Sequence, residues 1–198
     1  MRLGVLGGTF DPIHAGHLIL GEAAREQLDL ARVLFVPTGH SWRKGDREIA
    51  PGSDRLEMVR RAIAGNPHFE SSTLELDREG PSYSEVTLAA IKGQHPDADL
   101  FFILGRDALA DLPNWHDPQA VVELATLAVA ERSGDGGAAP LDESALPGLQ
   151  ARLVTVQMPR IDVSATDVRD RVRAGRSIRY LVPDAVADSI AERGLYRH

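Results

Sequence analysis

A glycine-rich turn between a strand and a helix constrains the fold of this chain more than any other feature. Residues 2–6 are short and mostly apolar, which predicts a buried strand, and residues 18–28 carry apolar side chains at helical spacing. Between them lies Gly7-Gly8-Thr9-Phe10-Asp11-Pro12-Ile13-His14-Ala15-Gly16-His17. In such a turn, backbone N–H groups and a helix N-terminus can hold phosphate. His14 and His17 are three residues apart, so we expect them on one face of the helix's first turn.

The rest of the chain repeats this alternation of strand and helix. Further strands are predicted for residues 33–36, 69–76, 100–104, 126–130 and 153–156. This spacing predicts an α/β fold with a doubly wound, mostly parallel, Rossmann-like sheet of about six strands and helices on both faces. The sequence has 198 residues and no evident repeat or linker. The simplest organisation is a single domain over residues 1–198.

Polar segments follow several of the predicted strands. In a parallel sheet, ligands bind beyond the carboxyl ends of the strands. We therefore expect four segments to meet at one edge: the Gly7 turn, the loop carrying Lys44, the Gly105 turn and the segment at Ser164. The loop over residues 38–52 is long and rich in glycine and charge, which is typical of a functional loop.

Composition excludes several classes of protein. The net charge of −7 argues against a protein that coats nucleic acid, so no nucleic-acid partner is expected. No apolar run approaches the roughly 20 residues of a membrane helix, and the chain enters a strand at once, without a signal peptide. Because there are no cysteines, disulfides and thiolate metal sites are excluded. We expect a cytoplasmic protein that does not bind membranes.

The glycine-rich turn differs from the common phosphate-binding and metal-binding motifs. It is neither the dinucleotide G-x-G-x-x-G pattern nor the G-x-x-x-x-G-K-[ST] loop. His14 and His17 could suggest zinc, but no third ligand is evident and there is no H-E-x-x-H, so we expect no metal held by the protein. The plainer alternative is a pair of surface histidines at a helix start. Gly16 weighs against that alternative because it lets a ligand approach the backbone closely.

The motif His14-Ala15-Gly16-His17 resembles the H-x-G-H signature of the nucleotidyltransferase superfamily, which class I aminoacyl-tRNA synthetases share. From residue 1 to the end, the chain resembles the bacterial nicotinate-nucleotide adenylyltransferase family. Five further segments carry the resemblance: Phe35-Val36-Pro37, Gly80-Pro81-Ser82-Tyr83-Ser84, Phe102-Ile103-Leu104-Gly105-Arg106-Asp107, Leu112-Pro113-Asn114-Trp115 and Val163-Ser164-Ala165-Thr166-Asp167-Val168-Arg169. A single H-x-G-H is moderately specific, whereas this series of motifs in order is strong.

The resemblance implies a reaction of ATP with nicotinate mononucleotide, giving nicotinate adenine dinucleotide and pyrophosphate. The nucleophile is a 5′-phosphate whose second pKa is about 6, so it is largely anionic at neutral pH and needs no general base. It needs in-line placement against the α-phosphorus and relief of charge on the leaving pyrophosphate. His, Lys and Arg side chains, helix N-termini and Mg²⁺ brought by the ATP phosphates suit that work.

For ATP, the resemblance implies contacts from two helix starts. His14 and His17 are expected at the phosphates, with the backbone of the turn that precedes them. Arg169 is expected to reach over the triphosphate, although by spacing alone the hydroxyls before it would be ordinary helix caps. The implied ATP-binding set is Gly7, Gly8, Thr9, Phe10, His14, His17, Lys44, Ser164, Thr166 and Arg169, of which His14, His17, Lys44 and Arg169 are expected to be catalytic.

The loop before Lys44 departs from the family pattern. Lys44 aligns with a family lysine that approaches the ATP phosphates. The family usually has Pro-Pro-His-Lys there, and this chain has Ser41-Trp42-Arg43-Lys44. The lysine is retained, but the stiffening prolines and the histidine are absent. The role of Arg43 stays open.

For the mononucleotide, Trp115 matches the family tryptophan that stacks on the pyridine ring; the alternative is a half-buried tryptophan packed under a turn. Ser84 stands where the family usually has threonine, and we expect its backbone N–H to hold the nicotinate carboxylate with another N–H near Asp111. Asp111 replaces a family tyrosine, so only its backbone is a candidate. The remaining residues implied for this substrate are Gly105, Asp107 (for a ribose hydroxyl) and Arg132, which Ser133 follows in place of a family proline.

Four alternatives stay beside this prediction. One is a related small-substrate enzyme, such as phosphopantetheine adenylyltransferase, and another is an enzyme that prefers the amide mononucleotide. Trp115 and the segment 80–84 favour a pyridine nucleotide. A third is an RNA-acting relative of the synthetases, which an acidic chain of 198 residues without a K-M-S-K-S stretch disfavours. The fourth is a non-catalytic nucleotide-binding module, against which His14, His17 and Arg169 argue. Assembly into a homo-oligomer stays open.

Overall fold

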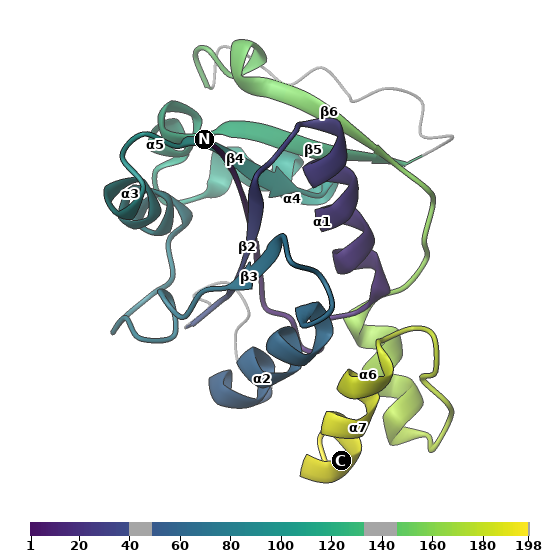
Figure 1. Cartoon of the computed structure of the whole chain (residues 1–198). Helices are drawn as coiled ribbons and strands as arrows, with labels where there is room; N and C mark the ends of the chain where they lie inside the picture. Colours follow the sequence, from purple (N-terminus) through teal and green to yellow (C-terminus); the bar gives the residue numbers. More distant parts are fainter. Residues whose placement is uncertain (40–48, 133–145, 198) are drawn as a thin grey trace.

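A computed structural model describes residues 1–39, 49–132 and 146–197, and its strands form one six-stranded sheet (Figure 1). The strand order is β3-β2-β1-β4-β5-β6, and every neighbouring pair is parallel. The strands are β1 (Arg2–Gly8), β2 (Arg32–Pro37), β3 (Phe69–Ser71), β4 (Asp99–Leu104), β5 (Thr126–Arg132) and β6 (Leu153–Met158). The predicted α/β fold with a parallel sheet of six strands is confirmed.

Helices connect the strands and follow the last of them. They are α1 (Ala15–Gln27), α2 (Gly52–Ile63), α3 (Ser84–Gln94), α4 (Arg106–Asp111), α5 (Pro118–Leu124), α6 (Ala165–Arg173) and α7 (Asp184–Arg193), with short 3₁₀ helices η1 (Leu112–Asn114) and η2 (Gln150–Arg152). In the part of the chain that the structure describes, no helix has the length and apolarity needed to cross a membrane.

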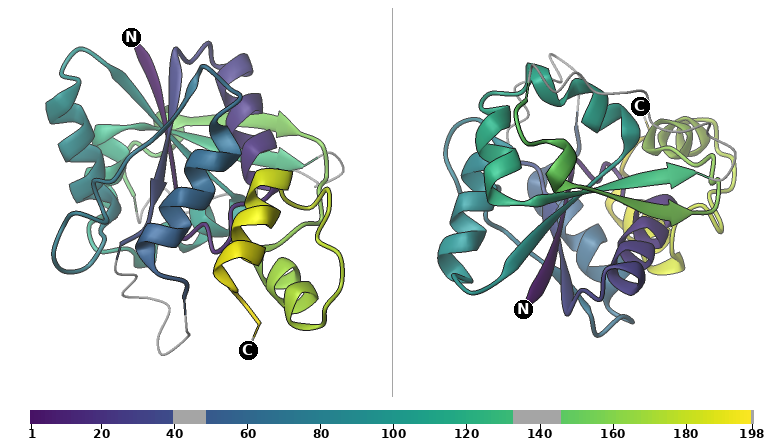
Figure 2. Two further views of the ribbon diagram at one scale, coloured as in Figure 1. Left: turned by 60° about the horizontal axis from the view of Figure 1, so that its bottom comes forward. Right: turned by 90° about the horizontal axis from the view of Figure 1, so that it is seen from above.

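Alternate residues of each strand point to opposite faces of the sheet, and both faces are packed in apolar cores. Leu6, Phe35 and Ile103 belong to one apolar core, which they share with residues of α1, α2, α6 and α7. Their chain neighbours Val5 and Phe102 belong to a second core, shared with α3, α4 and α5. Seen from above in Figure 2, the sheet passes between these two layers of helices. Helices therefore cover both faces, as predicted.

The topology reverses direction beside β1, and this fixes where a ligand can bind. β1 pairs with β2 on one side and with β4 on the other. From β1 the chain adds β2 and β3 in one direction, and from β4 it adds β5 and β6 in the other. A crevice opens at such a switch point, beyond the carboxyl ends of the strands. In Figure 1, α6 and α7 lie at that end of β1, and α2 packs against α7.

The third strand is shorter than the sequence predicted. We expected a strand over residues 69–76, but β3 ends at Ser71 and the chain then turns, with the Asp77 N–H donating to the Thr73 carbonyl at 2.9 Å. β3 lies at the edge of the sheet and pairs only with β2 over Val33 to Phe35. Because no strand of the described residues lies on its other side, nothing in the described sheet requires it to continue.

Candidate active site

The turn after β1 carries a strained, buried phenylalanine that supports one of the histidines. Phe10 has a φ of +49°, in the left-handed region that bulky residues seldom adopt, and its side chain is 2% exposed. Its ring meets the His17 ring edge-on, with 5.0 Å between centroids. Phe10 therefore offers only its backbone to a ligand, while its side chain positions His17.

His14 and His17 form a stacked pair at the start of α1. Their ring centroids are 3.7 Å apart and the planes differ by 26°, so they share one face, as their spacing predicts. A Cβ on Gly16 would lie 3.2 Å from the His14 ring, so a glycine fits this packing best. The His14 N–H donates to His17 Nδ1 at 3.2 Å. A neutral His17 consequently holds its proton on Nε2, where it can donate to a ligand.

His14 is the more buried histidine of the pair. It is 8% exposed, and burial lowers its pKa from 6.5 to about 4, so it is neutral at pH 7. Its Nδ1 atom is buried without a hydrogen-bond partner among the described residues. This atom is therefore available to a polar ligand that enters the site.

The start of α6 supplies the second half of the site. Ser164 is the N-cap, and its Oγ accepts the Asp167 N–H at 3.1 Å. Arg169, one turn further on, is 7% exposed and donates to Thr166 Oγ1 at 2.9 Å and to the Asp11 carbonyl. The last contact joins residues 158 positions apart in the sequence. It fixes the start of α6 against the turn that leads into α1.

A buried carboxylate holds this junction together. Asp11 is 3% exposed, and its Oδ1 accepts the Ala50 N–H at 3.2 Å and the Tyr196 hydroxyl at 2.8 Å. Its Oδ2 lies 3.7 Å from Arg169 Nη1. Burial, and then the nearby Asp11 charge, raise the pKa of Tyr196, so this hydroxyl stays protonated and remains a donor. The C-terminal segment thus fastens the first motif.

A buried arginine holds the same turn from α2. Arg55 is 4% exposed and donates to the Thr9 carbonyl at 2.8 Å and to the Ala50 carbonyl at 2.9 Å. Burial lowers its pKa, while the Asp11 charge acts in the opposite direction. Sequence reasoning missed Asp11, Arg55 and Tyr196. Only Asp11 gave a local signal, as a charged residue inside an otherwise apolar and glycine-rich motif.

Two adjoining cavities lie between these helix starts. The larger, of about 440 Å³, is lined by residues that include Gly7, His14, His17, Gly105, Asp107 and Ser164. The smaller, of about 160 Å³, is lined by Thr9, Phe10, Asp11, His17, Ile49, Ala165, Thr166 and Arg169. His17 and Ala165 belong to both. The Gly7 turn, the Gly105 turn and the Ser164 segment therefore meet at one edge of the sheet, as predicted.

Gly105 and Asp107 line the same cavity as residues that were predicted for ATP. The resemblance assigned them to the mononucleotide, together with Trp115. In the structure they line the larger cavity with His14 and Ser164, whereas Trp115 and Ser84 line neither cavity. The physical reason is that the Gly105 turn directly follows β4, the neighbour of β1, so it faces the start of α1.

Trp115 lies just after η1 and is half-buried. Its ring meets Phe102 edge-on at 6.1 Å, and its Nε1–H donates to Asp111 Oδ2 at 3.3 Å. Asp111 is the last residue of α4 and the N-cap of η1, and its Oδ1 also accepts from Asn114 Nδ2 at 3.2 Å. The helix start expected near Asp111 is thus the start of η1. The Asp111 side chain orients the indole.

Ser84 is the first residue of α3, so its N–H belongs to the first turn, where helical N–H groups lack partners within the helix. The residues on either side of it reach the segment that follows Trp115. The Tyr83 ring stacks on His116 with 4.1 Å between centroids, and His116 Nδ1 lies 2.8 Å from Glu85 Oε1. These contacts bring the two predicted segments together. Tyr83, Glu85 and His116 were not predicted.

Two predicted residues lie wholly or partly outside the described part of the chain. Lys44 lies outside the described residues, as do Ser41, Trp42 and Arg43. Arg132 is the last residue of β5, paired with Met158 of β6, and its side chain lies outside the described part.

No group of three or more histidines and carboxylates that could hold a metal ion occurs within residues 1–39, 49–132 and 146–197.

A family model and full-length relatives with the same enzyme name match this chain. The cytidylyltransferase-like family model matches residues 5–171. A probable nicotinate-nucleotide adenylyltransferase of Roseiflexus is 47% identical over 98% of this chain and 98% of its own length. The corresponding protein of Thermomicrobium roseum is 45% identical over 99% of this chain and 92% of its own length.

Solved structures agree on the fold. The nicotinic acid mononucleotide adenylyltransferase of Plasmodium falciparum, solved in complex with NaAD, superimposes with a TM-score of 0.76 at 19% identity, over 98% of this chain and 97% of that one. Family model, full-length sequence identity and fold thus point the same way. The chain belongs to the cytidylyltransferase-like family and, within it, to the nicotinate-nucleotide adenylyltransferases.

Proposed function

We propose that this protein transfers the adenylyl group of ATP to nicotinate mononucleotide, giving nicotinate adenine dinucleotide and pyrophosphate in NAD biosynthesis. Relatives with this enzyme name match the chain over almost its whole length. The observation that carries the proposal is the convergence of two helix starts, at His14–His17 and at Ser164–Arg169, on adjoining cavities. Such an arrangement suits a chain of phosphates.

The reaction is an in-line displacement at the α-phosphorus of ATP. An oxygen of the mononucleotide 5′-phosphate forms a bond to this phosphorus while the bond from it to the bridging oxygen breaks. Pyrophosphate leaves with that electron pair. No proton has to be removed from the nucleophile, so the work of the protein is alignment and stabilisation of negative charge.

We call His14, His17, Ser164, Thr166 and Arg169 the phosphate end of the site. His17 donates from Nε2 to a phosphate oxygen, because its Nδ1 already accepts the His14 N–H. Arg169 supplies the positive charge, held in place by Asp11 and Thr166. N–H groups at the start of α6 and the backbone of residues 7–10 complete the cradle. We assign Lys44 to the same phosphates by its resemblance to the family lysine.

The larger cavity is the proposed site for the adenosine of ATP. It continues from His14 and His17 toward Gly105 and Asp107. We therefore reassign these two residues from the mononucleotide to the ATP ribose. A carboxylate such as that of Asp107 accepts hydrogen bonds from vicinal hydroxyls.

We call Tyr83, Ser84, Glu85, Trp115 and His116 the ring end of the site. Trp115 stacks on the pyridine ring, and Asp111 orients the indole. The first-turn N–H of Ser84 binds the nicotinate carboxylate, since a helix N-terminus favours an anion. Arg132 stays assigned to the mononucleotide.

ATP enters as its Mg²⁺ complex. The donor chemistry of the described phosphate end fits this, because it consists of histidines, an arginine, hydroxyls and N–H groups that match phosphate oxygens, while the nearby Asp11 carboxylate is engaged by Ala50 and Tyr196. Mg²⁺ neutralises charge on the phosphates. We further propose one domain over residues 1–198, working in the cytoplasm on two nucleotide substrates and without nucleic acid; the net charge of −7 supports the last point.

The decisive experiment compares kcat/KM for nicotinate mononucleotide, nicotinamide mononucleotide and 4′-phosphopantetheine with MgATP. We expect the nicotinate form to exceed the amide by at least about tenfold, as expected for a charged group at helix-start N–H groups. A preference for the amide would identify the amide enzyme, and a preference for phosphopantetheine the other rival. Nucleotide binding without any turnover would identify a non-catalytic module.

A further inference from the structure

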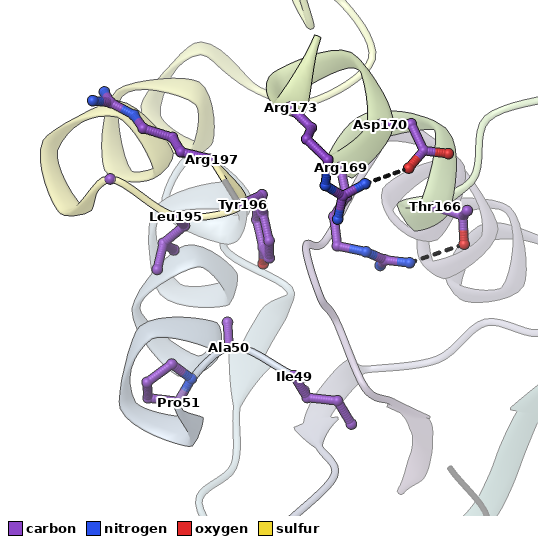
Figure 3. A pocket seen from close by; sticks show the side chains of 11 residues that line it. Ile49, Ala50, Pro51, Thr166, Arg169, Asp170, Arg173, Leu195, Tyr196 and Arg197 are labelled. Carbon is purple, nitrogen blue, oxygen red and sulfur yellow. Dashed lines mark hydrogen bonds and ion pairs between the residues drawn. The ribbon is translucent and has the colours of Figure 1, made fainter. Parts of the chain in front are cut away.

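A third cavity lies beyond the phosphate end and has no part in the proposed reaction so far (Figure 3). Its volume is about 510 Å³, and its walls come from three places: the residues before α2, one face of α6 and the C-terminal segment. It is lined by Ile49, Ala50, Pro51, Thr166, Arg169, Asp170, Arg173, Gly194, Leu195, Tyr196 and Arg197. We call it the outer cavity.

The outer cavity continues the two already described. It shares Ile49, Thr166 and Arg169 with the smaller cavity, which in turn shares His17 and Ala165 with the larger one. The three cavities therefore lie in series along the start of α6. On the proposed function, adenosine occupies the first, the phosphates the second, and the outer cavity opens on the far side of the phosphates.

One face of α6 leads from the phosphates into the outer cavity. Thr166, Arg169 and Arg173 are spaced three and then four residues apart, so they lie on one face of the helix. Thr166 and Arg169 line both the smaller cavity and the outer cavity. Arg173, one turn further on, lines the outer cavity and neither of the other two. Figure 3 shows the Arg173 and Arg169 side chains on the same side of α6, across the cavity from Tyr196.

The charge of the outer cavity favours an anion. Among the described residues that line it, Arg169, Arg173 and Arg197 carry positive charge and Asp170 carries the one carboxylate, which accepts from Arg173 Nη1 at 2.7 Å. Arg197 donates to the Ala191 carbonyl at 3.2 Å and lies toward α7. Arg173 is therefore the cation best placed to receive an anion that passes Arg169. A guanidinium pairs with two phosphate oxygens at once.

We propose that the outer cavity is the release site for pyrophosphate, with Arg173 as its binding residue. This rests on the proposed function, which produces pyrophosphate next to Arg169. The dinucleotide product still fills the adenosine cavity when pyrophosphate forms, so the larger cavity is closed to it. Movement along α6 exchanges contacts with Arg169 for contacts with Arg173, and Asp170 releases Arg173 as it does so.

The test measures the reverse reaction, in which inorganic pyrophosphate and nicotinate adenine dinucleotide give ATP. In Arg173→Gln we expect the KM for pyrophosphate to rise about fivefold, the effect of one partly exposed charged contact. The KM for the dinucleotide should stay within about twofold. The matched control is Arg171→Gln, which removes a comparable ion pair of α6 (with Asp167, 3.0 Å) at a residue outside all three cavities.

A second variant should act in the opposite direction. Asp170→Asn removes the carboxylate that competes for Arg173, so the KM for pyrophosphate should fall about twofold to threefold. Inhibition of the forward reaction by its product pyrophosphate should also change in both variants. Compared with the unaltered protein, it should be weaker in Arg173→Gln and stronger in Asp170→Asn.

Equal KM values for pyrophosphate in Arg173→Gln and Arg171→Gln would overturn the proposal, and so would an equal rise in the KM values for pyrophosphate and dinucleotide. Failure of the proposed function has a different signature. In that case the unaltered protein forms no ATP from dinucleotide and pyrophosphate, and it transfers no adenylyl group in the forward direction.

Discussion

The phosphate end and the ring end of this site are built in opposite ways. Behind the phosphate end, the buried Arg169 and Asp11 and the half-buried Tyr196 come from distant parts of the chain and meet in a hydrogen-bonded network. At the ring end, two short segments, 83–85 and 111–116, meet through a ring stack and an ion pair in which the His116 side chain is 55% exposed.

This difference indicates which property the phosphate end and the ring end each have to supply. Charge that develops during a reaction is stabilised best by groups already fixed in place and shielded from water, which the buried network provides. A flat pyridine ring needs an apolar face and an anchor for its carboxylate, which a half-exposed surface can offer. We therefore expect changes at the phosphate end to lower kcat and changes at the ring end to raise KM for the mononucleotide.

The largest expected effect tests the phosphate end. His17→Ala removes the Nε2 donor, and kcat should fall at least about a hundredfold, the cost of one preorganised donor to developing charge. Steady-state kinetics with both substrates measure it, and His68→Ala, which alters an exposed histidine that lines none of the three cavities, is the control. Near-normal kcat in a folded His17→Ala protein would refute the assigned role.

The next effect tests the ring end. Trp115→Ala removes the stacking surface, and the KM for nicotinate mononucleotide should rise about thirtyfold, within the range of one aromatic stacking contact. The KM for ATP should stay within about twofold. If both KM values rose together, the tryptophan would be supporting the fold and not the pyridine ring, and the contrast between the two ends would fail.

A third prediction concerns the buried histidine at the phosphate end. The pKa of His14 is lowered to about 4, below its ordinary value of 6.5, so the unfolded chain binds a proton more readily than the folded one. The contribution of His14 to the free energy of unfolding is therefore complete above pH 6.5, and it decreases as the pH falls from 6.5 toward 4. The unfolding constant should rise by up to about tenfold per pH unit in that window.

Urea unfolding at pH 7.5, 6.5 and 5.5 measures this contribution. His14→Gln should flatten the pH dependence of the free energy of unfolding, and His68→Gln should leave it as it is. A wild-type slope retained in His14→Gln would mean that His14 is not the group responsible.

The smallest effect tests how the buried network acts. Tyr196→Phe removes one hydrogen bond to the Asp11 carboxylate. Asp11 retains its hydrogen bond from the Ala50 N–H and its ion pair with Arg169. We expect kcat/KM for ATP to fall about threefold with the KM for the mononucleotide unchanged. Tyr180→Phe is the control, because that side chain is 84% exposed. An equal loss for both substrates would make the contact a general support of the fold.

The sequence predicted much of this molecule because its signals were local. Strand and helix periodicity gave the parallel sheet, and the position of each turn after a strand predicted that Gly7, Gly105 and Ser164 would share one edge. His14 and His17 stack as their spacing required. The predicted strand over 69–76 was too long, because apolar alternation does not reveal that a strand lies at the edge of a sheet.

Other features depended on contacts that no local pattern encodes. Arg55 and Tyr196 look like ordinary residues of a helix and a C-terminal segment, and only the folded chain turns them toward Thr9 and Asp11. Asp107 belongs to a motif whose resemblance implied a role at the mononucleotide, and the pairing of β4 beside β1 places it in the same cavity as His14.

The sequence by itself determined the fold class, the family and the residue types that meet phosphate, since periodicity and motif order are properties of the chain. The tertiary structure decided which of these residues share a cavity, which of them are shielded from water, and that three cavities follow one another along α6. The physical reason is that burial and long-range hydrogen bonds arise only when segments more than a hundred residues apart pack together, as Asp11 and Arg169 do.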